Sequence, residues 1–364
     1  MIIVDFSHLS YRNLFTSIYS SKPKKDKNTG KYITEKWFPM YVHQMLFSLS
    51  KIEKKFEGYG PIILALDSKS NWRKEYLEKS GYKNSRKKLR DESDVNFEEF
   101  FEKNNKFLEF LKKGLGYIIV QVDDVEADDI GYVLSNYFKE ETILVTEDKD
   151  WKQHLIGNLN VHLYQPIKDE LTENNESIQD ILKKFRATHI LIGDKADDIP
   201  NVMSDVEFTE EFINFIKEKH IENTIPSKVE KLDIFDELVK EALEKNINIY
   251  KSIRFGEKTA VKFIKNPKEF INKKIKDKKK LYDNIRRNRI LVDIKKLPSK
   301  YKKNIINSFL ENKNNLSNIS NEILESFLTE MNLNQVRNLT LNGIDLSIIP
   351  NKKLSNIMND MFNF

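Results

Sequence analysis

Short apolar runs rich in strand-forming residues alternate along this chain with longer segments whose apolar residues recur at helical spacing. The strand-like runs lie at 1–5, 61–66, 116–122, 142–146 and 159–164. The clearest helical stretches lie at 37–56, 97–111 and 126–138. Strands that alternate with helices predict an α/β fold, in which helices flank a mostly parallel sheet.

The pattern also divides the chain into three regions, 1–202, 203–310 and 311–364. The stretch at about 203–250 has helical spacing and separates two motif-bearing segments, so we interpret it as an insertion. From about residue 310 the chain becomes rich in Asn and Leu, and helical spacing continues. These features predict a C-terminal helical extension, and its composition indicates no function.

Composition limits the chemistry that is available. The chain has no cysteine, which excludes disulfides and thiolate metal sites and leaves oxygen or histidine as metal ligands. No uncharged stretch approaches the ~20 apolar residues of a membrane helix, and the strand-like start lacks a basic leader. We therefore expect a soluble protein of the cytoplasm that contacts no membrane.

The charges are unevenly distributed, although the net charge is only +5. Basic residues crowd 73–90 and 258–303, whereas acidic residues gather near the ends of the predicted strands and helices. That separation is expected where metal ions and a polyanion meet one surface. For any single lysine, a solvated surface position is the simpler interpretation.

Carboxylates follow several predicted strands, and the carboxyl ends of parallel strands share one edge of a sheet. Other acids open the helix at 126–138 or stand three residues apart after it, which places them on one helical face. Together the candidate residues are Asp5, Asp67, Glu126, Asp128, Asp129, Asp148, Asp150, Asp194 and Asp197. The sequence predicts that these side chains converge.

Converging carboxylates need compensation, because each raises the pKa of its neighbours. Oxygen ligands without histidine or cysteine favour Mg²⁺, for which Mn²⁺ can substitute, and two ions about 4 Å apart would suit phosphodiester hydrolysis. Taken singly, each acid could instead cap a helix or sit in a turn. The ligand spacing of a calcium-binding EF-hand is absent from these segments.

Five motifs stand in an order that resembles the 5′-nuclease superfamily of flap endonucleases and 5′→3′ exonucleases, and most of all the RNase H group of T-even bacteriophages. They are Val4-Asp5-Phe6-Ser7, Leu66-Asp67, Glu126-Ala127-Asp128-Asp129, Thr146-Glu147-Asp148-Lys149-Asp150-Trp151 and Gly193-Asp194-Lys195-Ala196-Asp197-Asp198-Ile199-Pro200-Asn201-Val202. The resemblance covers residues 1 to about 310. It implies a PIN-like catalytic domain at 1–202, a helical DNA-binding region at 203–310 and a helical arch at about 70–95.

The resemblance also implies a ligand set. Five acids would surround a first metal ion, namely Asp5, Asp67, Glu126, Asp128 and Asp148. Asp150, Asp194 and Asp197 would serve a second ion, partly through water. Asp129 and Asp198 are not assigned, and the family usually has Asn at the second of these positions.

Basic and aromatic residues alternate in the segment that corresponds to the arch. Cations that track phosphates and rings that stack on bases suit a single strand, and the candidates are Trp72, Arg73, Tyr76, Tyr82, Lys83 and Arg86. A solvated basic loop is the alternative. Lys83 and Arg86 resemble a family pair, which implies that they stabilise the transition state electrostatically, beside the catalytic acids Asp5 and Asp67.

The segment 254–264 resembles the second hairpin of the family's helix-three-turn-helix element, which holds duplex DNA. We expect Gly256 to allow a tight turn and Lys258 and Thr259 to bind phosphate at the helix start. A plain helix start is the alternative. The stretch at 203–250 precedes this segment and leaves open whether the family's potassium ion binds here. Arg286, Arg287 and Arg289 are interpreted either as part of the family's next motif or as ordinary surface charge.

The resemblance implies a Mg²⁺-dependent, two-metal 5′-nuclease that removes RNA primers and 5′ flaps in DNA replication, acting in the host cytoplasm if phage-encoded. Its substrates would be DNA and RNA–DNA hybrids with 5′ ends or flaps. A PIN-like ribonuclease and a catalytically inactive replisome adaptor are the alternatives. A single-stranded-DNA-binding protein and a sliding clamp are candidate partners. The tail at 357–364 is similar to clamp-binding peptides, although packing on its own helices is the favoured interpretation.

Overall fold

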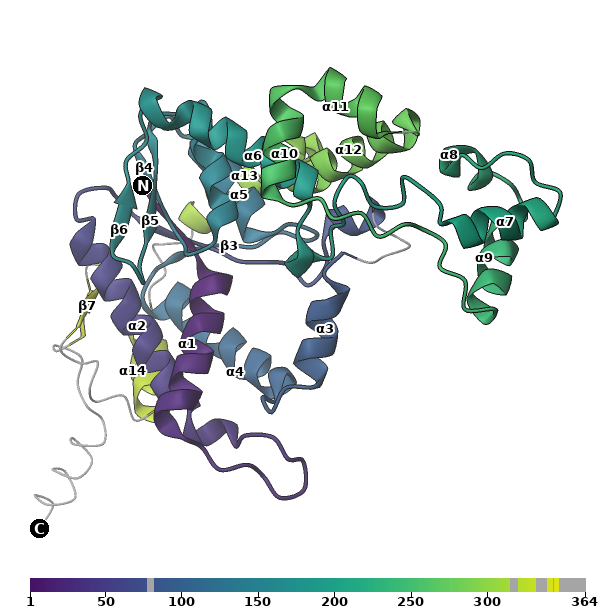
Figure 1. Cartoon of the computed structure of the whole chain (residues 1–364). Helices are drawn as coiled ribbons and strands as arrows, with labels where there is room; N and C mark the ends of the chain where they lie inside the picture. The colour runs from purple at the N-terminus through teal and green to yellow at the C-terminus, as the bar shows by residue number, and fades with distance from the viewer. Residues whose placement is uncertain (77–81, 276, 315–319, 332–338, 343, 347–364) are drawn as a thin grey trace, which may run out of the picture. The chain divides into compact units, whose positions relative to one another are not determined.

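The computed structural model describes residues 1–76, 82–275, 277–314, 320–331, 339–342 and 344–346. The chain forms two compact units (Figure 1). We call Met1–Trp72, Lys88–Gln179 and Leu297–Phe364 the sheet unit, and Arg73–Lys87 and Asp180–Lys296 the helical unit. The predicted domain boundaries at 202 and 310 remain predictions.

The sheet unit is built on six strands in the order β3-β2-β1-β4-β5-β6. They are β1 (Ile2–Asp5), β2 (Ile62–Ala65), β3 (Ile118–Val120), β4 (Thr142–Val145), β5 (Val161–Gln165) and β6 (Glu170–Thr172). All pairs are parallel except β5 with β6. The predicted α/β class and mostly parallel sheet are confirmed. The sequence analysis missed β6, which is three residues long and too short for a clear alternating pattern.

Helices cover both faces of this sheet. In β1, Ile2 and Val4 join a core that also contains residues of α1 (Phe6–Ser21), α2 (Phe38–Lys55) and α4 (Phe97–Glu109). Ile3 is equally buried, and its side chain points to the opposite face because side chains alternate along a strand. In addition, α5 (Ala127–Tyr137) contacts β1 and β2, and α13 (Ser299–Asn314) contacts β3 and α5. The three helices predicted at 37–56, 97–111 and 126–138 are therefore present.

The last part of the chain adds to this same core. On α14 (Asn321–Glu330), Phe327 stacks on Phe110 with ring centroids 4.3 Å apart and also contacts Phe107. A two-stranded antiparallel hairpin follows, formed by β7 (Thr340–Leu341) and β8 (Ile344–Asp345). The predicted helical extension is thus present, and the hairpin is an addition to it. The tail at 357–364 lies outside the described residues.

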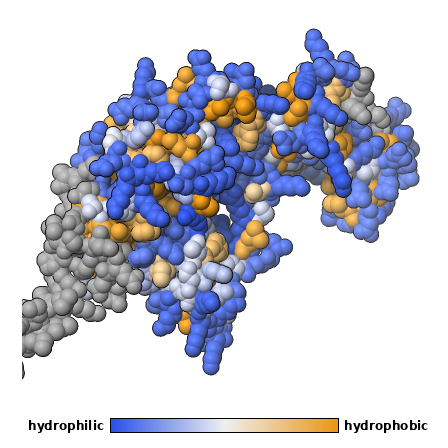
Figure 2. Space-filling view, turned by 60° about the vertical axis from the view of Figure 1, so that its left-hand side comes forward, coloured by the Kyte–Doolittle hydropathy of each residue, from blue (hydrophilic) through white to orange (hydrophobic). Residues whose placement is uncertain are grey.

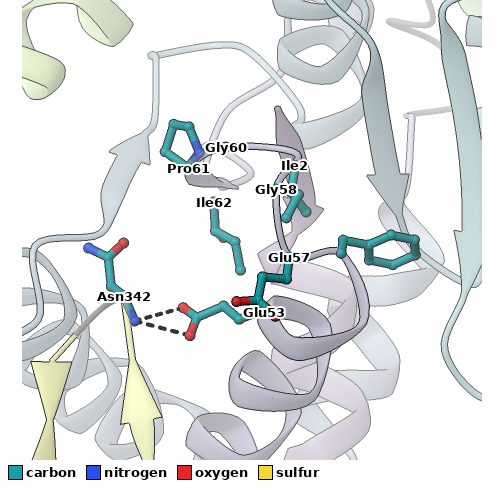
Figure 3. Close-up of a pocket in the computed structure, with 9 residues that line it drawn as sticks. Ile2, Glu53, Glu57, Gly58, Gly60, Pro61, Ile62 and Asn342 are labelled. Atoms are coloured by element: carbon teal, nitrogen blue, oxygen red, sulfur yellow. Dashed lines mark hydrogen bonds between the residues drawn. The ribbon is translucent and has the colours of Figure 1, made fainter.

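A pocket opens at the amino ends of β1 and β2, where Ile2 and Ile62 line it (Figure 3). Beside it, the Glu53 carboxylate accepts hydrogen bonds from the Asn342 backbone N–H at 3.0 Å and from the Tyr117 hydroxyl at 2.5 Å. The bond from Asn342 joins α2 to the hairpin, and the bond from Tyr117 joins α2 to the segment before β3. The pocket therefore lies at the end of these strands opposite to the predicted acidic residues.

The described residues of the helical unit form three hydrophobic clusters: a small one of Tyr82, Ile199, Leu291 and Val292, and two larger ones. One is formed by α7 (Glu210–Glu218), α8 (Pro226–Val229) and α9 (Phe235–Glu244), around rings such as those of Phe208, Phe212 and Phe235. The other involves α6 (Gln179–Ile192), α10 (Glu257–Lys265), α11 (Pro267–Lys274) and α12 (Lys278–Val292), with Phe255 and Leu281 buried in it. The helical prediction for 203–250 is confirmed. These helices have a hydrophobic core of their own, which is consistent with the interpretation of this stretch as an insertion.

Among the described residues, no helix is long and apolar enough to cross a membrane. The face drawn in Figure 2 is mostly hydrophilic, with apolar residues scattered among polar ones. Isolated exposed apolar residues of this kind are normal on a protein surface.

Candidate metal site and nucleic-acid-binding segments

The acidic residues of the sheet unit follow four adjacent strands. Asp5 is the last residue of β1, and β1 pairs with β2 on one side and β4 on the other. Asp67 comes two residues after β2, and Asp148 comes three residues after β4. The Glu126–Asp129 run follows β3 at the start of α5. Because these strands are parallel, all of these acids follow strand ends at the same edge of the sheet.

Asp5 is buried at the centre of this edge, with 5% of its surface exposed. Its Oδ1 accepts a hydrogen bond from the His8 backbone N–H at 2.9 Å, which caps α1, and its Oδ2 accepts one from the Thr146 hydroxyl at 2.9 Å. Burial, together with the negative charges of Asp67 and Asp148, raises the pKa of Asp5 to about 8. A carboxylate has about four acceptor positions, so these two bonds leave capacity for a cation.

Asp67 joins the end of β2 to the start of α5. Its Oδ1 accepts a hydrogen bond from the Ala127 backbone N–H at 2.8 Å, and its own backbone N–H donates to the Ser7 hydroxyl at 2.9 Å. It therefore caps a helix that begins 60 residues later in the chain. An acid at this position also complements the partial positive charge of the α5 amino end.

Asp129 is completely buried and serves the local structure of α5. Its Oδ2 accepts from the Glu126 backbone N–H at 3.3 Å and from the Trp72 indole N–H at 3.1 Å. Trp72 is itself buried, with 3% of its surface exposed. The interpretation of Trp72 as a ring that stacks on a base does not fit this placement, since its ring packs inside the sheet unit.

The Asp148–Asp150 segment is held by its own hydrogen bonds. The Asp148 backbone N–H donates to the Thr146 hydroxyl at 3.0 Å, and the Asp148 Oδ1 accepts from the Asp150 backbone N–H at 2.9 Å. Asp148 thereby caps the 3-10 helix η4 (Lys149–Leu155). Thr146 bonds to both Asp5 and Asp148, so one hydroxyl fixes the ends of two neighbouring strands.

A histidine on η4 ties this segment to α5. His154 lies between two backbone carbonyls, with Nε2 2.8 Å from the Asp128 oxygen and Nδ1 2.8 Å from the Trp151 oxygen. Its ring stacks on Trp151 with centroids 4.9 Å apart. Trp151 in turn lies so close to Gly131 that an added Cβ would come within 2.5 Å of the indole. Two acid-bearing elements are thus packed together without space for a larger residue.

In the helical unit, a sharp turn presents the second acidic motif. Gly193 has φ +69°, and an added Cβ would lie 2.3 Å from the Ile199 carbonyl oxygen. This close approach allows Asp194 and Ile199 to exchange two backbone hydrogen bonds, of 2.9 and 2.7 Å. The Asp194 Oδ2 also lies 3.2 Å from the His189 Nε2. Glycine at position 193 is therefore required by both conformation and space.

The same loop holds a basic segment that begins before α3 (Asn84–Asp91) and runs into that helix. Asp197 contacts three of its residues: the Lys83 ammonium at 3.6 Å, the Tyr82 hydroxyl at 3.2 Å and the Arg86 guanidinium. Half of the Arg86 side chain remains exposed. The predicted cations and the predicted acid Asp197 are thus brought together within this unit.

The other predicted contacts of this segment differ in exposure. Tyr76 is 44% exposed and can meet a ligand. Arg73 and Tyr82 are buried, with 2% and 3% of their surfaces exposed, and the Arg73 Nε donates to the Leu291 carbonyl at 3.1 Å. In this conformation Arg73 and Tyr82 support the unit from inside, and neither is placed to bind a strand directly.

The predicted phosphate-binding turn at 254–264 contains the start of α10, and Gly256 is its N-cap. Gly256 has φ −95° and ψ 179°, and nothing lies within 4 Å of an added Cβ. The expectation that glycine is needed here for a tight turn is therefore wrong, because any residue adopts this extended conformation. Lys258 and Thr259 stand in the first turn of the helix, as predicted.

Residues 1–185 match the family model described as the 5′-3′ exonuclease, N-terminal resolvase-like domain. The match spans half of the 364-residue chain. The chain belongs to this 5′-3′ exonuclease family. The family resemblance that the motifs indicated is thereby confirmed.

This family member is similar to ribonuclease H of Enterobacteria phage T4, with 30% identity over 216 residues. The similarity spans 57% of this chain and 65% of the relative, which is just under two thirds of its length. Among solved structures, T5 5′-exonuclease with bound divalent zinc has a TM-score of 0.48 at 17% identity, covering 88% of this chain and 98% of that one. The bacteriophage T5 D15 flap endonuclease, in a complex with DNA and metal ions, has a TM-score of 0.45 at 17% identity, covering 89% and 98%.

The sequence analysis of this exonuclease family member missed several residues that support the acids. Thr146 could have been found, because a hydroxyl two residues before Asp148 and directly after a strand is a common local partner. His154 and Gly131 carry no local signal, since their contacts are with distant elements. Ser7 lies inside a quoted motif, but its bond to Asp67 depends on the pairing of β1 with β2.

Proposed function

We propose that this chain is a Mg²⁺-dependent, structure-specific 5′-nuclease with 5′→3′ exonuclease, flap endonuclease and RNase H activity. The observation that carries the proposal is the row of acids after the adjacent strands β3, β2, β1 and β4, with Asp5 buried at its centre. A row of this kind raises the free energy of the folded state unless a cation compensates its negative charge. Membership of the 5′-3′ exonuclease family supports the same reaction.

The residues present fit a hard divalent cation. Asp5, Asp67, Glu126, Asp128 and Asp148 offer only oxygen atoms, which suit Mg²⁺ and Mn²⁺ better than Zn²⁺. The raised pKa of Asp5 is the effect that a bound cation would reverse, because it would favour the charged carboxylate. When bound, the metal would supply a hydroxide nucleophile and stabilise charge on the phosphate. The roles of Asp150, Asp194 and Asp197 with a second ion are carried over from the family resemblance.

The helical unit supplies the groups for nucleic acid. Lys83 and Arg86 are proposed to stabilise negative charge on the scissile phosphate, and Tyr76 is exposed enough to stack on a base. At the start of α10, Lys258, Thr259 and the free helix amides are proposed to hold a phosphate of the duplex. The T5 flap endonuclease was solved with DNA and metal ions, which fits a nucleic-acid substrate.

Removal of RNA primers and 5′ flaps during replication is the proposed role, in keeping with the name of the T4 relative. A sliding clamp and a single-stranded-DNA-binding protein are the proposed partners. A clamp pull-down with the full chain and with a chain that lacks 357–364 tests the first of these. Equal recovery of the clamp would exclude the tail as its binding segment.

The proposed activity is tested with a 5′-labelled flap, a nicked duplex and an RNA–DNA hybrid, each with Mg²⁺ and with EDTA. We expect Asp67→Asn and Asp148→Asn to slow cleavage more than about a hundredfold while DNA affinity stays nearly unchanged, because a ligand is lost and the phosphate contacts remain. Asp180→Asn is the matched control, since that side chain is 93% exposed on α6. Normal turnover by either acidic variant would refute the assignment.

The same substrates separate the two alternatives. A PIN-like ribonuclease would cut single-stranded RNA without needing a 5′ end. An inactive adaptor would bind the flap and leave it intact in every metal. Cleavage that needs both a 5′ end and Mg²⁺ excludes both.

A further inference from the structure

We propose that Asp198 is a positioning residue for the proposed reaction: its carboxylate anchors the start of α3 and so holds Lys83 and Arg86 in place. The inference rests on the proposed function, in which those two cations stabilise negative charge on the scissile phosphate. The Asp198 Oδ2 accepts a hydrogen bond from the Ser85 backbone N–H at 2.9 Å. That donor lies in the first turn of α3, where helix N–H groups have no partner within the helix.

The anchor is part of a short interface between two segments of the helical unit. The Lys83 backbone N–H donates to the Asp197 carbonyl at 3.1 Å, and the Arg86 Nε donates to the Ala196 carbonyl at 3.3 Å. Ala196, Asp197 and Asp198 therefore each accept a hydrogen bond from a residue within 83–86. Each of these bonds fixes either a proposed catalytic cation or Ser85, which lies between the two cations.

The residues of α3 itself contribute little packing, although Tyr82, two residues before the helix, is buried against Ile199, Leu291 and Val292. Residues 85–91 are all exposed, including Leu89 at 67%. The helix has only eight residues, and isolated helices of fewer than about 12 are marginal in water. Lys83 also adopts φ 57°, which is unfavourable for a residue with a side chain and persists only where its surroundings impose it. The polar contacts at the start of α3, together with the buried Tyr82 ring, therefore hold Lys83 and Arg86.

Asp198 has a conformation that suits this task. Its φ of 59° and ψ of 25° are left-handed, a region that Asp and Asn tolerate better than other residues with side chains. An Asn amide oxygen can accept a hydrogen bond from the Ser85 N–H as the carboxylate does. A metal ligand would behave differently, because an amide is a much poorer ligand for Mg²⁺ than a carboxylate.

The test uses Asp198→Gly, which removes the carboxylate and keeps the left-handed conformation without strain, and Asp198→Asn, which keeps an acceptor. Asn246→Gly is the control, because Asn246 is exposed and has φ 57° at the end of α9. Hydrogen exchange of residues 82–91 is measured by mass spectrometry. Single-turnover cleavage and flap affinity are measured in Mg²⁺.

For Asp198→Gly we expect exchange in 82–91 to accelerate about fivefold, the effect of losing one helix cap. Its single-turnover rate should fall about tenfold while flap affinity changes less than about twofold, because the cations are displaced and the duplex contacts remain. Asp198→Asn and Asn246→Gly should match the wild type within about twofold in all three measurements.

Two results would overturn the proposal. Unchanged exchange in Asp198→Gly would show that the carboxylate holds nothing. Loss of cleavage in Asp198→Asn, together with a higher Mg²⁺ requirement, would make Asp198 a metal ligand. If the wild type cleaves none of the substrates, the proposed function fails, and the exchange comparison still tests the anchor by itself.

Discussion

Replacing Gly193 with alanine tests whether the turn before Asp194 is held as tightly as its geometry indicates. The added methyl would lie 2.3 Å from the Ile199 oxygen and 2.5 Å from the Pro200 oxygen. Both neighbours are backbone atoms, so they cannot swing aside as a flexible side chain would. The φ of +69° adds strain for any residue with a Cβ.

The expected loss in the free energy of unfolding follows from these two effects. A left-handed conformation costs an L-residue about 1–2 kcal/mol. Moving Ile199 away would break the two backbone hydrogen bonds that it exchanges with Asp194, each worth about 1 kcal/mol net. We therefore expect Gly193→Ala to lower the free energy of unfolding by about 3–4 kcal/mol. That loss is a large part of the 5–15 kcal/mol of a typical domain.

Thermal unfolding followed by circular dichroism measures this loss, and the transition of the helical unit should fall by roughly 10 °C. Gly256→Ala is the matched control in the same unit. Its φ is −95° and nothing lies within 4 Å of an added Cβ, so we expect a change of less than about 1 kcal/mol. If both variants unfold at the wild-type temperature, the close approach of Ile199 to position 193 is not real.

Three further predictions concern the sheet unit. The Asp5 pKa is raised by burial and by Asp67, so the folded state keeps a proton that the unfolded state loses, and in EDTA the free energy of unfolding should fall as pH rises from about 4 to 8. Urea titrations at several pH values measure this free energy. In Asp5→Asn it should change less with pH, and a wild type whose free energy of unfolding rises with pH would contradict the prediction. Gly131→Ala should slow cleavage and lower the melting temperature, because its methyl would overlap the Trp151 ring at 2.5 Å, and wild-type behaviour in both assays would exclude that contact. Phe327→Ala should lower the free energy of unfolding, measured in urea, by about 3–5 kcal/mol, because a ring stacked in the core is lost. A decrease of less than about 1 kcal/mol would show that α14 does not pack on this core.

The acids of the sheet unit could be predicted from the sequence because the signal for them is local. Asp5, Asp67 and Asp148 each follow an apolar run of strand-forming residues, and parallel strands that end in acids place those acids at one edge. The helices at 37–56 and 97–111 were equally clear, since an apolar stripe repeats with the period of a helix. Family membership, carried by the same motifs, followed from the order of these residues along the chain.

The partners of these residues could not be predicted, because they come from elements far apart in the chain. The order of the strands brings Thr146 to Asp5, and the packing of η4 on α5 brings His154 to the Asp128 carbonyl. The sequence pattern also did not predict which side chains are buried. Trp72 stands in a basic segment, yet its indole N–H donates a hydrogen bond to Asp129 inside the sheet unit. A local pattern determines which residues form strands and helices and which acids end them. Contacts between distant segments depend on how side-chain volumes and hydrogen-bonding groups fit once those elements pack, and this only the tertiary structure decides.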